Sequence, residues 1–129
     1  MSTAIRIIID GVELSAELND STTAAALLER LPLELRMSRW GDEYYGDIGD
    51  SLRVAVAAEA RDVLEVGELA FWSPGNALCA FFGPTPASEN GEPRAASDVN
   101  PLGRITGDAT VLRPLGGGVR MRVERVPSS

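Results

Sequence analysis

The segment from Gly67 to Pro86 constrains the fold more than any other part of the chain. It contains two short apolar runs, 69–72 and 77–82, separated by the sequence Ser-Pro-Gly-Asn. Proline fixes φ near the value that a turn needs and glycine readily adopts positive φ, so Pro74-Gly75 predicts a tight turn between two strands. All three Phe residues and one of the two Trp residues lie in this segment. We expect it to form a central hairpin that contributes to the core and to the rim of any pocket.

Alternating apolar and polar residues predict further strands along the chain. Residues 5–9 and 12–18 alternate on either side of Asp10-Gly11, which is a strong signal for a β-hairpin. A second hairpin is expected late in the chain, with a flexible glycine-rich tip. The remaining expectations are strands over 33–40, 43–48, 52–56 and 103–107, and the late hairpin pairing 109–113 with 119–126.

One helix is expected near the N-terminus. Residues 24–31 place apolar side chains on one face, residues 19–23 supply capping side chains, and Pro32 ends the pattern. Residues 87–101 are rich in small and polar residues, which predicts a long loop that is either functional or disordered. The last three residues, 127–129, are expected to be frayed.

These elements predict a mainly β protein. With 129 residues, the chain is expected to form a single domain over residues 1–129. About eight short strands with regular turns and one short N-terminal helix are typical of a closed antiparallel β-barrel, in which closure also removes exposed strand edges.

Composition excludes several classes of function. The chain has no His and no Lys, and its one cysteine is Cys79, so Ser-His and Cys-His catalysis, Schiff-base chemistry, an internal disulfide and a thiolate metal cluster are all excluded. Cys79 lies in an apolar run and is interpreted as a small buried residue. The net charge of −7 disfavours nucleic acid as a partner, and no apolar run is long enough for a membrane span. We therefore expect a cytoplasmic protein with no nucleic-acid or membrane partner.

Acidic residues cluster around one predicted turn. Asp42, Glu43, Asp47 and Asp50 could offer oxygen ligands to a hard cation, but their spacing does not match a calcium-binding loop. Acidic turns are usually solvated, so we predict neither a metal site nor a cofactor.

Four stretches of the chain together resemble the small prokaryotic cyclophilin-like proteins, which suggests a bacterial source. They are Trp40–Tyr45 (WGDEYY), Val66–Trp72 (VGELAFW), Pro74–Cys79 (PGNALC) and Phe81–Pro86 (FFGPTP), with shorter matches following in order at 93–97, 99–100 and 103–105. The resemblance covers most of the chain. It implies the cyclophilin barrel, with eight antiparallel strands and helical caps. It implies no particular activity, because the family as a whole has none established.

A fainter resemblance extends to the true prolyl isomerases. Phe81-Phe82 would correspond to the aromatic pair of their peptide groove, and Arg39 is the nearest candidate for the arginine that donates to the substrate. The chain departs from their pattern because it has no His and no Gln, so the partners of that arginine are missing. The competing interpretation is that Arg39 is a solvated strand residue and the aromatic side chains fill the barrel.

The resulting hypothesis is a cyclophilin-like binding module that recognises a small anionic or peptide-like ligand in an aromatic-lined groove. Arg94 has the chemistry to bind a carboxylate or a phosphate, but it is equally well explained as a residue that pins its loop to the barrel. The alternatives are a weak or vestigial peptidyl-prolyl isomerase acting through Arg39, and a partner-binding subunit of a larger amide-cleaving assembly. Both monomer and homodimer remain open. The predicted ligand-binding residues are Tyr44, Trp72, Asn76, Phe81, Phe82, Arg94 and Ser97.

Overall fold

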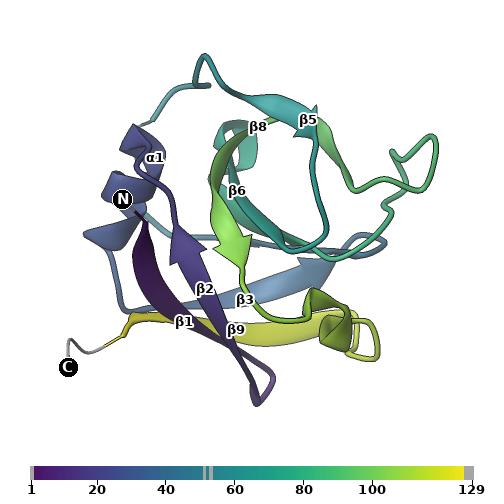
Figure 1. Cartoon of the computed structure of the whole chain (residues 1–129), viewed down its shortest axis with the longest axis horizontal. Helices are drawn as coiled ribbons and strands as arrows, with labels where there is room; N and C mark the ends of the chain where they lie inside the picture. The colour runs from purple at the N-terminus through teal and green to yellow at the C-terminus, as the bar shows by residue number, and fades with distance from the viewer. Residues whose placement is uncertain (1, 51, 53, 127–129) are drawn as a thin grey trace.

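A ring of eight antiparallel strands forms the body of the computed structural model, which describes residues 2–50, 52 and 54–126 (Figure 1). Around the ring the order is β2-β1-β9-β3-β4-β7-β6-β8, and β8 pairs back with β2. The strands are β1 (Thr3–Ile9), β2 (Val12–Leu18), β3 (Leu33–Arg39), β4 (Glu43–Asp47), β6 (Glu68–Trp72), β7 (Ala77–Phe81), β8 (Arg94–Ile105) and β9 (Gly118–Arg125). The mainly β fold predicted from the sequence, with about eight antiparallel strands and one short N-terminal helix, is confirmed.

The two strongest hairpin predictions are confirmed. β1 and β2 pair over their full length around Asp10 and Gly11, both of which have positive φ. β6 and β7 pair around a 3₁₀ turn, η1 (Ser73–Gly75). Within that turn the predicted role of glycine was wrong: Asn76 has the left-handed conformation, at φ 50°, because the 3₁₀ turn occupies the three preceding residues.

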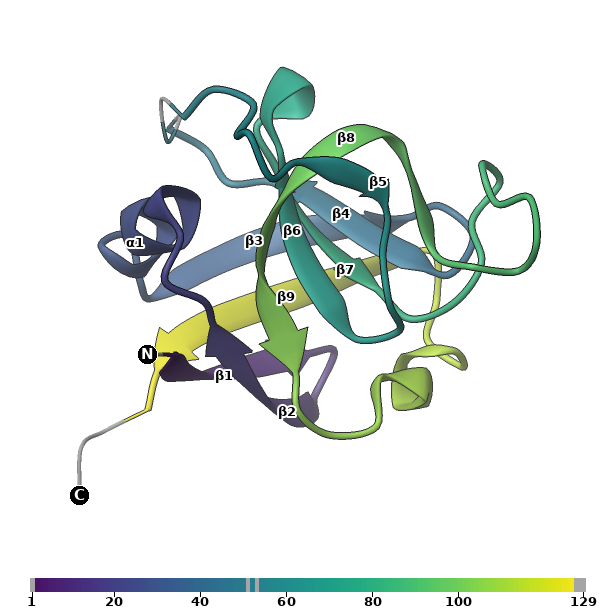
Figure 2. The same ribbon diagram turned by 45° about the horizontal axis from the view of Figure 1, so that its top comes forward.

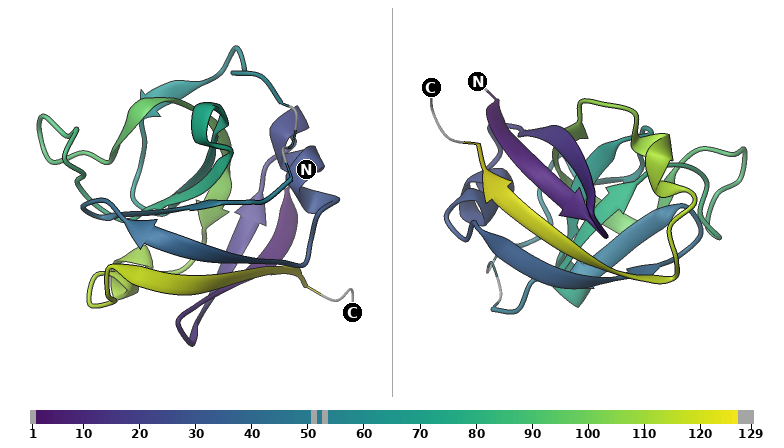
Figure 3. Two further views of the ribbon diagram at one scale, coloured as in Figure 1. Left: turned by 180° about the vertical axis from the view of Figure 1, so that it is seen from behind. Right: turned by 90° about the horizontal axis from the view of Figure 1, so that it is seen from below.

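The helix α1 (Thr22–Leu28) covers one end of the barrel, as Figures 1 and 3 show. The side chain of Ser21 caps it by accepting a hydrogen bond from the backbone N–H of Ala24, at 3.1 Å. The helix buries Thr23, Ala24 and Leu27. No helix of the described residues is long and apolar enough to cross a membrane.

Three segments differ from the prediction, two of which were expected to form strands. The expected strand over 52–56 was wrong: Leu52 and residues 54–56 are not in a strand, and Arg53 lies outside the described residues. The short strand here is β5 (Arg61–Val63), which pairs with the first half of β8. The expected late hairpin was also wrong, because 109–112 form a second 3₁₀ turn, η2 (Ala109–Leu112). The side chain of Asp108 caps this turn by accepting the backbone N–H of Thr110. The predicted fraying of 127–129 lies outside the described residues.

β8 takes the second half of the expected loop over 87–101, from Arg94 onward. It curves from its pairing with β5 to its pairing with β2, as Figure 2 shows. The segment has few large apolar residues, yet its backbone pairs with β5 and β6. At Gly103 a Cβ atom would lie 1.9 Å from the carbonyl oxygen of Glu17, so closure of the ring requires glycine there.

The side chains inside the ring form the main hydrophobic core. β1, β9 and β3 lie side by side on one side of the barrel, as the right-hand view of Figure 3 shows. Their inward residues meet those of β4, β7 and β8; fully buried examples are Ile5, Ile7, Ile9, Met37, Leu78, Leu102 and Met121. A second, smaller cluster lies on the outer face of β6 and β7 and includes Ala70, Ala77, Cys79, Phe81, Ala95 and Val99.

Candidate functional site

A pocket of about 290 Å³ opens beside this second cluster, on the outer face of the barrel. Its floor comes from β4, β6 and β7, and one wall comes from the first half of β8, which β5 holds in place. The lining residues are Trp40, Glu43, Tyr45, Trp72, Cys79, Ala95, Ala96 and Val99. We refer to this feature as the outer pocket.

Strand register explains why these residues meet. Tyr45 of β4 lies opposite Cys79 of β7, and Glu43 lies opposite Phe81, so alternate residues of both strands face outward. Trp40 and Glu43 flank the tight Gly41-Asp42 turn between β3 and β4, and the backbone N–H of Trp40 donates to the carbonyl of Glu43 at 2.8 Å. The turn therefore places an indole ring beside a carboxyl group.

Glu43 is the unusual group of the outer pocket. Its residue is only 5 % exposed, and its Oε1 accepts no hydrogen bond from the described residues. Burial raises the pKa of Glu43 from 4.5 to about 7, and a hydrogen bond with the thiol of Cys79 offsets part of that rise. The same burial, together with the charge of Glu43, raises the pKa of Cys79 well above its usual value, so the thiol stays protonated at neutral pH.

Trp72 is held in place from two sides. Its Nε1 donates a hydrogen bond to the hydroxyl of Ser97 on β8, at 2.7 Å. Its ring lies against the backbone of Gly75, where a Cβ atom would come within 2.6 Å of the ring carbons. Gly75 is therefore needed for the position of this ring. The outer pocket has one wall fixed by both a hydrogen bond and a close backbone contact.

The chemistry of the outer pocket follows from its lining. Three aromatic rings and several small apolar side chains surround one carboxyl group, and no lining residue carries a positive charge. Small clefts with a few placed polar groups are typical binding sites for organic molecules. The arrangement can bind an apolar body and offer a hydrogen-bond or charge partner at Glu43.

The residues predicted from sequence to bind a ligand are dispersed. Trp72 lines the outer pocket, and Ser97 contacts Trp72 from β8. Phe81 lies on the outer face but is fully buried in the second cluster, whereas Tyr44 and Phe82 point into the barrel and are also fully buried. Their rings stack at a centroid distance of 5.4 Å. In this arrangement all three rings contribute to packing.

Arg39 precedes Trp40 at the end of β3 but does not itself line the outer pocket. Its side chain donates to the carbonyl oxygens of Gly41, Arg113 and Leu115 at 2.7–2.8 Å, and pairs with Asp42 at 2.8 Å. The guanidinium carbon lies 5.0 Å from the ring centroid of Phe82. Four of the five N–H donors of Arg39 thus have acceptors within the chain.

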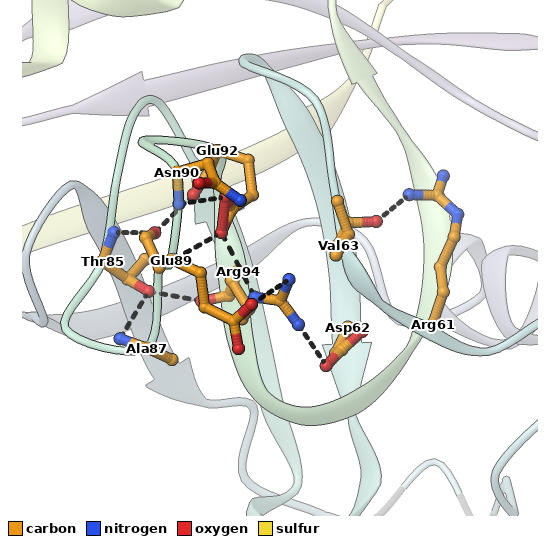
Figure 4. A network of polar contacts seen from close by, with 10 residues as sticks. Arg61, Asp62, Val63, Thr85, Ala87, Glu89, Asn90, Glu92 and Arg94 are labelled. Atoms are coloured by element: carbon orange, nitrogen blue, oxygen red, sulfur yellow. Dashed lines mark hydrogen bonds and ion pairs between the residues drawn. The ribbon is translucent and has the colours of Figure 1, made fainter.

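Arg94 is held by acidic residues, as Figure 4 shows. It pairs with Asp62 at 3.0 Å and with Glu92 at 3.2 Å, and Glu89 lies 3.9 Å away. Glu92 also accepts the backbone N–H groups of Glu89 and Asn90, and these bonds lower its pKa to about 2. These contacts are those of a residue that pins the loop to β5 and β8, one of the two roles predicted for it.

Asn76 serves the turn that contains it. Its side-chain N–H₂ donates to Asp47 at 3.1 Å and to the carbonyl of Gly49 at 2.8 Å, so it joins the β6–β7 turn to the segment after β4. A role in ligand binding for Asn76, Arg94 and the other predicted residues stays a prediction.

Sequence reasoning missed most of the outer pocket. Trp40, Tyr45, Ala95, Ala96 and Val99 were not among the predicted site residues, and Glu43 and Cys79 were interpreted as a solvated acidic residue and a small buried one. The alternation of β4 does place Glu43 and Tyr45 on one face, opposite Tyr44. The alternation does not show that residues of β8 pack on this outer face, because that packing is long-range.

Comparisons with known proteins agree with the fold. A family model described as cyclophilin-like matches residues 3–124. The solution structure of a hypothetical protein from Archaeoglobus fulgidus is similar with a TM-score of 0.79 and 35 % sequence identity, over 97 % of this chain and 95 % of the archaeal one. No curated protein gives a significant match.

Proposed function

The chain belongs to the cyclophilin-like family, and on that premise we propose that it is a binding module. Its ligand is a small, mainly apolar molecule that occupies the outer pocket and forms a hydrogen bond with Glu43. The volume of about 290 Å³ suits a molecule with one ring or a short branched chain.

The observation that carries this proposal is the unpartnered carboxyl oxygen of Glu43. Buried polar atoms are nearly always hydrogen-bonded, because leaving one unpaired costs about 1–3 kcal/mol. Glu43 Oε1 is buried and lacks a partner among the described residues, and Glu43 is one of the residues that line the pocket. A ligand that donates a hydrogen bond there recovers this cost. Such a donor is a natural complement to the site.

The charge of the site favours a neutral or cationic ligand over the anionic one expected from Arg94. Ion pairs with Asp62 and Glu92 already engage Arg94, and it does not line the outer pocket. The pocket's own titratable groups are Glu43, Tyr45 and Cys79. An anion would have to approach a buried carboxyl group without a neighbouring cation, which is unfavourable.

The isomerase alternative depends on Arg39. Localising the lone pair of a prolyl nitrogen requires a donor that is free to point at the substrate, and most donors of Arg39 are already bonded. We expect no acceleration of cis–trans exchange in X-Pro peptides, measured by exchange NMR at high protein concentration. Acceleration by the wild type that Arg39→Lys abolishes would restore the isomerase hypothesis.

The binding proposal is tested by filling the outer pocket. A set of small aromatic and branched aliphatic fragments is screened by NMR, following the indole N–H signals of Trp40 and Trp72. We expect binding by the wild type and its loss in Ala96→Phe, which inserts a ring at the pocket rim. Ala58→Phe is the matched control, since Ala58 is equally exposed and lies outside the pocket. Fragments that bind equally to both variants, or to neither variant nor the wild type, would contradict the proposal.

A further inference from the structure

We propose that the group recognised by Glu43 is an organic ammonium, so that the outer pocket selects small amines on an apolar body. This inference rests on the proposed function and specifies its ligand class. It is carried by the juxtaposition of a buried carboxyl group with the rings of Trp40, Tyr45 and Trp72.

The first argument is electrostatic. The face of an aromatic ring attracts a cation, and an ammonium group close to several rings gains from each of them. Trp40 and Trp72 are partly buried and Tyr45 is 39 % exposed, so each ring borders both the pocket and the solvent. The carboxyl group of Glu43 adds a full negative charge once it is ionised. Rings and carboxylate together favour a cation over a neutral molecule of the same shape.

The second argument concerns the groups that face Glu43 from the packed elements. β7 contributes the thiol of Cys79 and β4 contributes the phenol of Tyr45, whereas β8 contributes only Ala95, Ala96 and Val99. None of these is cationic, so an incoming ammonium meets no competing positive charge. Oε1 of Glu43 is buried and has no partner among the described residues, so it can accept this N–H once the carboxyl group rotates toward the pocket that Glu43 lines.

The third argument is the coupling of binding to ionisation. Burial keeps the Glu43 carboxyl group largely protonated below pH 7, since its pKa is raised to about 7. A bound ammonium stabilises the carboxylate and therefore lowers that pKa. Amine binding then releases a proton at pH 6 but little at pH 8. The affinity for an amine rises between pH 6 and pH 8, whereas the affinity for a neutral analogue stays nearly constant.

The experiment compares benzylamine with benzyl alcohol by titration calorimetry and NMR. Both probes share a ring and an N–H or O–H donor, but only the amine is cationic. We expect the wild type at pH 8 to bind benzylamine at least about tenfold more tightly than benzyl alcohol. In Glu43→Gln this preference falls to about twofold or less, while Glu59→Gln, an exposed acidic site outside the pocket, retains it.

Each outcome bears on the inference. Equal binding of the two probes by the wild type overturns the ammonium assignment and leaves the proposed binding function intact. Binding of neither probe, when other fragments of the screen bind, also overturns it alone. The role of Glu43 is overturned if Glu43→Gln keeps the preference for benzylamine over benzyl alcohol. It is also overturned if the affinity of the wild type for benzylamine does not rise from pH 6 to pH 8, a measurement that needs no variant.

Discussion

Two neighbouring residues on β4 face two different environments, and their comparison separates the structural part of the molecule from the part available to a ligand. Tyr44 points into the barrel, is fully buried, and donates its hydroxyl hydrogen bond to the carbonyl of Gly116. Glu43 points outward, is nearly as buried, and has an oxygen with no partner. The same strand thus carries one buried polar group that is satisfied and one that is not.

The difference teaches how this barrel distributes its polar groups. Inside, Arg39 and Tyr44 reach backbone carbonyls near the η2 segment, and their contacts tie that segment to the barrel. Outside, Glu43 lines the outer pocket together with Ala95, Ala96 and Val99 of β8, whose side chains carry no hydrogen-bond donor. A group that raises the free energy of the empty protein is a natural place for a ligand to act, because binding removes the cost.

The largest expected loss of stability comes from a substitution in the barrel interior. Phe82→Ala removes a fully buried ring that stacks on Tyr44, and we expect it to lower the free energy of unfolding by about 3–5 kcal/mol in urea titrations. Trp72→Ala, at a half-buried ring of the outer pocket, should cost about 1–2 kcal/mol but abolish fragment binding. Equal costs for the two variants would mean that the outer pocket belongs to the cooperative core, against the distinction made here.

The next largest effect is the dependence of stability on pH that Glu43, the outward-facing residue of the pair, causes. The folded state holds the proton of Glu43 up to about pH 7, whereas the unfolded state releases it near pH 4.5. Between these values the folded protein binds more protons, so its stability falls as the pH rises, by up to about 3 kcal/mol from this residue. Above pH 7 the contribution of Glu43 levels off.

Glu43→Gln tests this expectation because it keeps the shape and removes the titration. Urea titrations at pH 5 and pH 8 should show the variant gaining stability relative to the wild type as the pH rises. Glu59→Gln provides the baseline for the loss of an exposed carboxylate. A Glu43→Gln variant that tracks the wild type at both pH values would show that Glu43 is ionised in the folded protein under both conditions.

The smallest effect uses two adjacent tyrosines. Tyr44→Phe removes the hydroxyl that bonds to Gly116 and should lower the free energy of unfolding by about 1 kcal/mol. Tyr45→Phe, at the half-exposed rim of the outer pocket, should change it by less than about 0.5 kcal/mol. Thermal unfolding of both variants measures the pair. If Tyr45→Phe lost more stability than Tyr44→Phe, the hydroxyl that stabilises the fold would be that of Tyr45, on the outer face of β4, and the comparison would fail.

The sequence predicted the barrel well because its hairpins are encoded locally. The Asp10-Gly11 turn and the 69–82 hairpin need only neighbouring residues to be recognised, and both are present. β8 could not be predicted in the same way, because its residues are small and its pairing with β5, β6 and β2 is long-range. For the aromatic pair Phe81-Phe82, the sequence left open whether the rings line a groove or fill the barrel; Phe81 ends β7, Phe82 follows it, and both rings are fully buried.

The candidate site was harder to predict than the fold for the same reason. Glu43 lies next to an acidic turn and has the local pattern of a solvated residue, yet it is buried and lines a pocket together with residues of β8. Arg94 has the local chemistry of an anion-binding residue, but Asp62 comes from a strand that sequence periodicity did not identify. In both cases these neighbours lie far away in the sequence.

β8 has a mechanical consequence for the whole molecule. One continuous backbone supplies the pocket wall at Ala95 and Val99, and closes the ring at Gly103. Between them, Asn100 bonds to Thr23 of α1 and to the carbonyl of Ala55. The pocket wall, the hydrogen bonds to the helical end of the barrel and the β2–β8 pairing that closes the ring therefore belong to one strand. We expect a ligand that restricts the motion of the wall to stabilise that closure as well.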